Sequence, residues 1–255
     1  MLRLRGPMGI AVAVLSIVAT ACGSTAAQPT VSHARPAAPY RYVAVGGTDA
    51  TGGATVDPLL DAWPQQLFRT SMPLSAVFVN AAVPQETVAG AAVDQVPTTL
   101  AASPTVVTVW LVTGDVLAGT SPAAYGAGLH SLLRALRRGG RTTVLVGNSP
   151  PAAQLPGLVA CQSGAERHNL RCPARVPDAT SAQATVTAYN TAVATAAAST
   201  GALVVDLDAA VSSTVAGGGP AVLNPTGADL STVGSTLVAK AFSAALRGAT
   251  GRTSP

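Results

Sequence analysis

The feature that most constrains this chain is a short apolar run, residues 42–45, that breaks into the polar turn Gly46, Gly47, Thr48 and Asp49. The run shows no alternation of apolar and polar residues, which is typical of a strand buried on both faces of a parallel sheet. In open α/β sheets, ligands bind just beyond the carboxyl ends of the strands. The turn is therefore the first candidate site in the chain.

Four more apolar runs alternate with helical patterns. The runs cover residues 76–80, 106–112, 142–147 and 202–207, and the helical patterns begin at Asp57 or cover residues 88–100, 121–136, 181–200 and 232–246. Pro64 is able to bend or shorten the first helix. This order predicts an α/β fold with three layers, α/β/α, around a five-stranded parallel sheet with right-handed crossovers. In the flavodoxin-like strand order 2-1-3-4-5, residues 46–49 and 113–115 would share one cleft.

Composition and glycine spacing favour one domain without a nucleic-acid partner or a bound cofactor. Of the 255 residues, 48% are hydrophobic and 10% are charged, which suits a single large core and not a disordered chain. The net charge of +4 includes two arginines of the expected leader, and the rest form no basic stripe, so we expect no nucleic-acid partner. The glycine-rich stretches 46–48 and 217–219 lack the spacing of phosphate-binding loops, and we expect no cofactor.

Residues 1–21 have the layout of a secretory signal peptide. Two arginines precede an apolar run that is too short to span a bilayer, and small residues follow. Residues 19–22 resemble the lipobox of bacterial lipoproteins, except that this family prefers Leu at the first position. The resemblance implies an acylated Cys22 and attachment to the outer face of the cell membrane. The residues after Cys22 are rich in Ala, Pro, Ser and Thr and show no periodicity, which predicts a flexible tether over residues 22–39. The alternative is an ordinary signal, with Cys22 as a passenger, and a secreted protein.

Two cysteines remain for the exported domain, Cys161 and Cys172, separated by a polar loop. In an exported chain they are most simply a disulfide that closes a short loop, which would stabilise the fold by about 2 to 3 kcal/mol. Zinc is the other interpretation, but these cysteines and His168 give three candidate ligands with no second CxxC or HxxxH nearby. We expect the disulfide and no metal site.

Four blocks of the sequence resemble, in order, the blocks of the SGNH/GDSL hydrolase family. Residues 42–48 resemble its Gly-Asp-Ser block, residues 79–87 its Asn-Leu-Gly block, residues 109–115 its Gly-x-Asn-Asp block, and residues 225–234 the block that supplies its Asp and His. The resemblance covers residues 40–246. It implies an SGNH hydrolase-like domain over residues 40–248, which a disordered tail over residues 249–255 would follow.

The same resemblance locates the catalytic positions of the family, and most of them carry other residues here. The nucleophilic Ser falls on Thr48, the Asp before it on Gly47, the catalytic His on Asp229 and its supporting Asp on Thr226. The oxyanion-hole glycine falls on Ala82, which keeps a backbone N–H, and the oxyanion-hole Asn falls on Gly114, next to the retained Asp115. Loss of one oxyanion donor typically lowers the rate about 100- to 1000-fold. An aspartate also titrates at about 4, far from the neutral pKa that suits a general base.

Three acids, Asp49, Asp115 and Asp229, would meet at the cleft if the alignment of the blocks holds. Three carboxylates could bind a cation, but helix capping and buried hydrogen bonds explain them as well. His168 lies in the loop after the fourth strand and could overhang the cleft as a substitute base. The simpler interpretation of His168 is an exposed loop residue.

Three functional hypotheses follow. The first is an envelope-anchored SGNH-like domain with a dismantled triad, whose cleft binds a ligand such as an acyl ester or a carbohydrate, or a partner, without ester hydrolysis. The joint replacement of the Ser, Asn and His positions motivates it. The second is an active esterase or acyl hydrolase with Thr48 as nucleophile and Asp229 or His168 as an unusual base. The third is a purely structural envelope lipoprotein whose cleft is filled. The sequence leaves the oligomeric state open.

Overall fold

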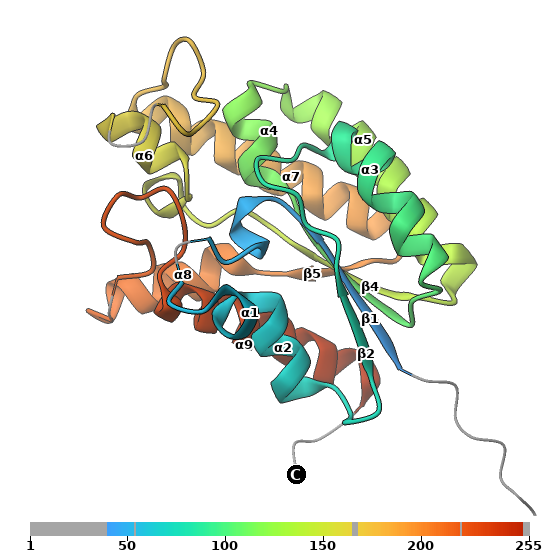
Figure 1. The fold of residues 1–255 in the computed structure, drawn as a ribbon. Helices are drawn as coiled ribbons and strands as arrows, with labels where there is room; N and C mark the ends of the chain where they lie inside the picture. The colour runs from blue at the N-terminus through green and yellow to red at the C-terminus, as the bar shows by residue number, and fades with distance from the viewer. Residues whose placement is uncertain (1–39, 54, 165–167, 220, 252–255) are drawn as a thin grey trace, which may run out of the picture. The chain divides into compact units, whose positions relative to one another are not determined.

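Five parallel strands form one sheet in the order β2-β1-β3-β4-β5 in the computed structural model (Figure 1). The strands are β1 (Arg41–Gly46), β2 (Val77–Asn80), β3 (Val106–Trp110), β4 (Thr143–Gly147) and β5 (Leu203–Val205). The sheet and its order confirm the sequence prediction. The structure describes residues 40–53, 55–164, 168–219 and 221–251, so the predicted signal peptide, Cys22 and the tether lie outside the described residues.

Helices cover both faces of the sheet (Figure 1). On one face pack α3 (Val88–Ala101), α5 (Pro122–Arg137) and α7 (Ala179–Thr200), and there Val43 and Val45 of β1 join the core. On the other face pack α2 (Trp63–Ser71), α8 (Leu207–Ala216) and α9 (Thr232–Thr250), and there Tyr42 and Ala44 join the core. Both faces of β1 are therefore buried, as its unbroken apolar run predicts.

Shorter elements complete the fold. They are α1 (Pro58–Asp61), α4 (Val112–Ala118) and α6 (Leu158–Ser163), with the 3-10 turns η1 (Thr48–Ala50), η2 (Arg138–Gly140) and η3 (Ala152–Gln154). Within the described part of the chain, no helix combines the length and the hydropathy needed to cross a membrane.

The turn after β1 depends on close packing around Gly46. A Cβ on Gly46 would lie 2.7 Å from the Cβ of Ala50 and 3.2 Å from the carbonyl oxygen of Trp110, so a side chain there forces a neighbour to move. The side chain of Gln95, buried in α3, accepts a hydrogen bond from the N–H of Gly46 at 2.9 Å and donates one to its carbonyl oxygen at 3.0 Å. These contacts fix the end of β1, and the chain continues into η1 with Thr48 as its first residue.

The third strand is shorter than predicted. Residues 106–112 are one apolar run, but β3 ends at Trp110 and Val112 already begins α4. The apolar pattern continues because α4 buries Val112 and Leu117, and Gly119 ends this helix in the left-handed conformation, at φ 69°. An apolar run that passes from a strand into a buried helix cannot be divided by hydrophobicity alone.

Other element ends also differ from the prediction. The fifth strand ends at Val205 because Asp206 caps α8, where its side chain accepts a hydrogen bond from the N–H of Ala209. The first predicted helix is divided into α1 and α2 at Ala62, which has extended backbone, since Pro64 lacks the N–H that would continue one helix across this point. The last helix, α9, continues to Thr250, which is within the predicted tail.

Candidate active site

A cavity of about 380 Å³ lies at the carboxyl edge of the sheet. Its wall consists of Thr48, Gly53, Pro84, Gln85, Asn169, Leu170, Asn224, Thr226, Ala228 and Asp229. The wall therefore combines the turn after β1, the segment after β2, the loop before Cys172 and the loop before α9. The three residues predicted at the triad positions, Thr48, Thr226 and Asp229, all line this cavity.

Thr48 is half-buried at the start of η1, which directs the chain away from the sheet. Its Oγ1 accepts a hydrogen bond of 2.8 Å from the backbone N–H of Gln85. Its carbonyl oxygen accepts hydrogen bonds from the backbone N–H of Thr51 at 2.9 Å and from the hydroxyl of Thr51 at 2.7 Å. The hydroxyl that corresponds to the nucleophile of the family is thus in direct contact with the segment that follows β2.

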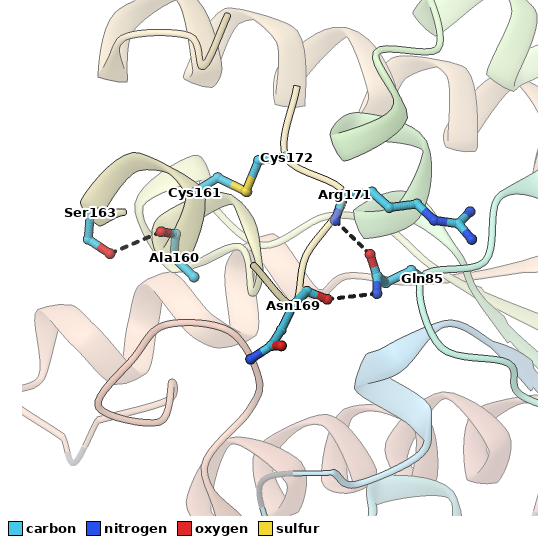
Figure 2. Close-up of a disulfide and its surroundings, with 7 residues drawn as sticks. All are labelled: Gln85, Ala160, Cys161, Ser163, Asn169, Arg171 and Cys172. Atoms are coloured by element: carbon cyan, nitrogen blue, oxygen red, sulfur yellow. Dashed lines mark hydrogen bonds between the residues drawn. A yellow bond between two sulfur atoms is a disulfide. The ribbon is translucent and has the colours of Figure 1, made fainter. Parts of the chain in front are cut away.

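Gln85 is held from both sides. Its backbone has φ 57°, a left-handed conformation that is uncommon for residues other than glycine. Its side-chain amide donates from Nε2 to the carbonyl oxygen of Asn169 at 3.0 Å and accepts at Oε1 from the backbone N–H of Arg171 at 2.7 Å (Figure 2). In the sequence, Gln85 is one residue of the second family block, and its type alone indicates no role.

Neither of the two positions expected to form the oxyanion hole offers a free donor: the N–H of Ala82 is already bonded, and the space beside Gly114 is filled. The backbone N–H of Ala82 donates to Oδ1 of Asn80 at 3.1 Å. Gly114 is the third residue of α4, and a Cβ there would lie 1.9 Å from the carbonyl oxygen of Glu86. No side chain fits at Gly114 while this carbonyl stays in place, so the asparagine of the family has no room here.

Asp49, next to Thr48 in the sequence, carries a buried carboxyl that is 5% exposed and is not part of the cavity wall. Its Oδ2 accepts a hydrogen bond of 2.7 Å from the hydroxyl of Thr113, and its Oδ1 has no hydrogen-bond partner within the described residues. Burial raises the pKa of Asp49 to about 7; the bond from Thr113 opposes this shift and the nearby charge of Asp229 adds to it. This carboxyl therefore exchanges its proton near neutral pH.

Asp115 is also buried, but hydrogen bonds to neighbouring segments satisfy its carboxylate. Its Oδ2 accepts a hydrogen bond of 2.7 Å from the backbone N–H of Val88, the first residue of α3, and its carboxylate is hydrogen-bonded to Thr120. Burial raises the pKa of Asp115, against the effect of these hydrogen bonds. Gly47, Asp49 and Asp115, expected at the cleft, are all buried and do not contribute to the wall of the cavity.

The loop before α9 is organised by Asn224, which the sequence analysis does not identify. Its Oδ1 accepts hydrogen bonds from the N–H of Ala228 and from the hydroxyl of Thr226, each at 3.1 Å. Its own N–H donates to the carbonyl oxygen of Asp229 at 3.0 Å. The sequence Asn-Pro-Thr-Gly at 224–227 is a turn signal that could have indicated this role.

None of the histidines in the described residues lines this cavity. His168 is exposed and is not part of the wall. His130 lies on α5 at a separate groove between α5 and α7. Among the described residues, no group of three His, Cys, Asp or Glu side chains is placed to hold a metal ion. The wall of the cavity thus offers hydroxyls, amides and one carboxylate.

Cys161 and Cys172 form a disulfide, as the sequence predicts (Figure 2). Cys161 is fully buried in α6 and belongs to a core cluster with Leu155, Leu158 and Val186. Cys172 is half-buried and directly follows Arg171, whose N–H contacts Gln85. The disulfide therefore joins the core to a segment in the wall of the cavity.

The comparisons with known proteins agree with this fold. The model of the GDSL-like lipase/acylhydrolase family matches residues 43–230. The chain therefore belongs to the GDSL-like lipase/acylhydrolase family, as the four sequence blocks predict. No sequence among the curated proteins matches the chain.

Solved structures with the same fold include several hydrolases. A lipase/acylhydrolase from Enterococcus faecalis is 18% identical, with a TM-score of 0.60 over 82% of this chain and 96% of that chain. A catalytic mutant of Axe2, an acetylxylan esterase from Geobacillus stearothermophilus, is 18% identical, with a TM-score of 0.59 over 80% of this chain and 92% of that chain. The psychrotrophic esterase EstA from Pseudoalteromonas is 13% identical, with a TM-score of 0.56 over 83% and 99%. At these identities the similarity shows the fold alone.

Proposed function

We propose that this protein is a GDSL-like domain that binds a small hydroxyl-rich ligand, such as a carbohydrate, without hydrolysing esters. The observation that carries the proposal is that the chain's own groups occupy the oxyanion positions of the family. The carbonyl of Glu86 fills the space beside Gly114, and the N–H of Ala82 is bonded to Asn80. An ester carbonyl beside Thr48 would lack both expected donors for its developing negative charge.

The groups near Thr48 also lack a base of the usual kind. Asp229 lies in the cavity wall at the position that the family blocks give to the catalytic histidine, so a carboxyl stands there in place of an imidazole. Asp49 has a pKa of about 7, but its carboxyl is buried and accepts a hydrogen bond from the hydroxyl of Thr113. General-base catalysis needs the base within hydrogen-bond reach of the hydroxyl that it activates. The Oγ1 of Thr48 is bonded to the backbone N–H of Gln85, which is a donor and not a base, and a threonine hydroxyl that no base activates is a weak nucleophile.

The composition of the wall favours a ligand with several hydroxyl groups. Donors and acceptors come from the hydroxyls of Thr48 and Thr226 and from the amides of Gln85, Asn169 and Asn224. A volume of about 380 Å³ lies within the range of small-molecule sites. Carbohydrate is a ligand of this kind, and one structural neighbour is described as an acetylxylan esterase.

Ester hydrolysis tests the absence of turnover. The rate with p-nitrophenyl acetate would be measured for the full chain, for Thr48→Ala and for the control Thr70→Ala, which changes an exposed threonine of α2. We expect the same background rate in all three. Turnover that is lost in Thr48→Ala and kept in Thr70→Ala would contradict the proposal and would support the hypothesis of an active esterase with Thr48 as nucleophile.

Thermal denaturation tests the binding role. A ligand that binds only the folded state raises the free energy of unfolding by RT ln(1 + [L]/Kd), and the melting temperature rises with it. Xylose, xylobiose and glucose would be added to the parent chain, to Asp229→Ala and to the control Asp94→Ala, which changes an exposed carboxylate on α3. We expect stabilisation of the parent and the control only. No stabilisation by any of the three sugars would contradict the carbohydrate proposal and favour the purely structural hypothesis.

Export as a lipoprotein remains part of the proposal. The pattern around Cys22 supports attachment to the outer face of the cell membrane. Replacement of Cys22 by Ser should move the protein from the membrane fraction to the soluble fraction of the cells. Retention of Cys22→Ser at the membrane would count against acylation at this residue and would leave a cleaved secretory signal as the alternative.

A further inference from the structure

The segment 168–172, called the strap below, connects the disulfide to the cavity. At one end, the bond from Cys172 to Cys161 attaches the strap to α6 and its core cluster. Asn169 and Leu170 of the strap lie in the cavity wall. The strap is therefore fixed on the core side and exposed to ligand on the other side.

The strap holds Gln85 through both ends of one amide group. Nε2 of Gln85 donates to the carbonyl oxygen of Asn169, and Oε1 accepts from the N–H of Arg171 (Figure 2). The backbone N–H of the same residue donates to Oγ1 of Thr48 at 2.8 Å. A continuous chain of contacts thus runs from the disulfide through the strap and Gln85 to the hydroxyl of Thr48.

The backbone of Gln85 needs this support. A non-glycine residue at φ 57° adopts an unfavourable conformation, and such conformations persist where surrounding contacts hold them. The two amide hydrogen bonds are contacts of that kind. Once they are released, Gln85 can return to a common backbone conformation, and its N–H then leaves Oγ1 of Thr48.

We propose that the strap is a disulfide-dependent lock, which keeps Gln85 against Thr48 while Cys161 and Cys172 are joined and releases it when they are reduced. The lock acts on the same cavity as the proposed function, and the inference rests on that function only for the consequence, which is a change in ligand access. The lock itself involves only the contacts among residues 48, 85 and 168–172.

The chemistry of release needs an external dithiol. Cys172 is half-buried whereas Cys161 is fully buried, so a thiolate of the dithiol attacks Sγ of Cys172 and displaces the thiolate of Cys161. The second thiol of the reductant then attacks its own sulfur in this mixed disulfide and displaces the thiolate of Cys172. Two electrons and two protons pass from the dithiol to the protein, which leaves two cysteine thiols and one oxidised reductant.

Access to residue 48 can be measured directly with a thiol reporter. Thr48→Cys in the full chain is exposed to iodoacetamide, and mass spectrometry of the peptide that contains residue 48 gives its alkylation rate separately from that of other cysteines. The rate is compared in the reporter alone, in the reporter with Cys161→Ser and Cys172→Ser, in the reporter with Gln85→Ala, and in a matched control with Gln162→Ala. Gln162 is an exposed glutamine of α6 that donates to the carbonyl oxygen of Pro177 and does not contact Gln85.

The lock predicts that alkylation becomes about tenfold faster or more in both variants, because Gln85→Ala removes the two hydrogen bonds and the serine pair removes the disulfide that keeps their strap partners in place. Gln162→Ala should stay within about twofold of the reporter alone. Unchanged rates in the serine pair or in Gln85→Ala would overturn the proposal. Circular dichroism checks folding, and if the serine pair does not fold, brief reduction of the folded reporter chain by dithiothreitol, followed by removal of the reductant, replaces it.

This readout is independent of any ligand or ester. The protein could bind a sugar even if the lock does not exist. The lock could also exist if the protein binds none of the sugars named above. Failure of the lock and failure of the proposed function therefore give different results.

Discussion

The segments after β1 and β3 lie beside each other at the carboxyl edge, and each carries a buried carboxyl, but the two carboxyls are satisfied to different degrees. Asp115, after β3, is bonded to the N–H of Val88 and to Thr120, and so it connects α4 to the start of α3. Asp49, after β1, accepts one side-chain bond, from Thr113, and its other oxygen has no partner in the described part of the chain. The carboxyl of Asp115 therefore contributes to packing. The carboxyl of Asp49 instead has a pKa of about 7.

This difference supports the proposal that the site does not hydrolyse esters. After β3, Gly114 packs against the carbonyl of Glu86, so the segment has no free polar side chain at the oxyanion position. After β1, Thr48 still presents a hydroxyl to the cavity. In the proposed function, a ligand meets this hydroxyl, while the groups expected at the oxyanion hole are engaged in other contacts.

The largest effect should come from restoring the asparagine of the family at Gly114. The new side chain would need the space of the Glu86 carbonyl, so we expect Gly114→Asn to lower the free energy of unfolding by about 3 kcal/mol or more. Urea denaturation measures this change. The control is Gly119→Asn, at a left-handed position with open space around it, which should cost about 1 kcal/mol or less. A Gly114→Asn variant as stable as the parent would show that the segment after β2 moves aside easily.

The next effect concerns pH and Asp49. Its pKa is raised from 3.8 to about 7 on folding, so the folded state holds this proton more tightly than the unfolded state. The resulting stabilisation is fully present below pH 3.8 and is lost as the pH rises through about 7. Between pH 5 and 8, the parent should lose about 2 to 3 kcal/mol from this group.

The variant Asp49→Asn isolates this contribution. Its amide cannot ionise, and its oxygen can still accept the bond from Thr113, so the loss of stability between pH 5 and 8 should become smaller by about 2 kcal/mol. Denaturation of both proteins at the two pH values measures it. Parallel pH profiles for parent and variant would show that another group is responsible and that the two carboxyls are more alike than described here.

The smallest effect is expected at Asp115, where two variants distinguish the charge of the carboxylate from its hydrogen bond to the N–H of Val88. Asp115→Ala leaves the N–H of Val88 without its acceptor and should cost about 2 kcal/mol. Asp115→Asn keeps an acceptor for that N–H and should cost about 1 kcal/mol or less. The difference between the two variants at one pH is the informative quantity. Equal losses would mean that the charge of Asp115, and not its hydrogen bond to α3, stabilises the fold.

Sequence reasoning predicts the sheet well because its strands are unbroken apolar runs, and such runs determine which segments are buried on both faces. It also predicts the disulfide, from the two cysteines that remain in a chain expected to be exported, and the convergence of Thr48, Thr226 and Asp229, from the family blocks. It does not predict that the backbone carbonyl of Glu86 fills the space at Gly114, because a backbone contact between distant segments has no residue signature. The role of Gln85 is missed for the same reason: its partners in the strap are backbone groups.

The most direct test of a non-hydrolytic site is its reactivity toward a fluorophosphonate, which forms a covalent bond with the activated nucleophile of serine-type hydrolases. The full chain and Thr48→Ala would be treated side by side, with a working GDSL-like esterase as the positive control, and intact mass would report the adduct. We expect an adduct on the esterase and none on either form of this protein. An adduct on the parent chain that maps to Thr48 and is absent from Thr48→Ala would contradict the proposed function and identify an activated nucleophile.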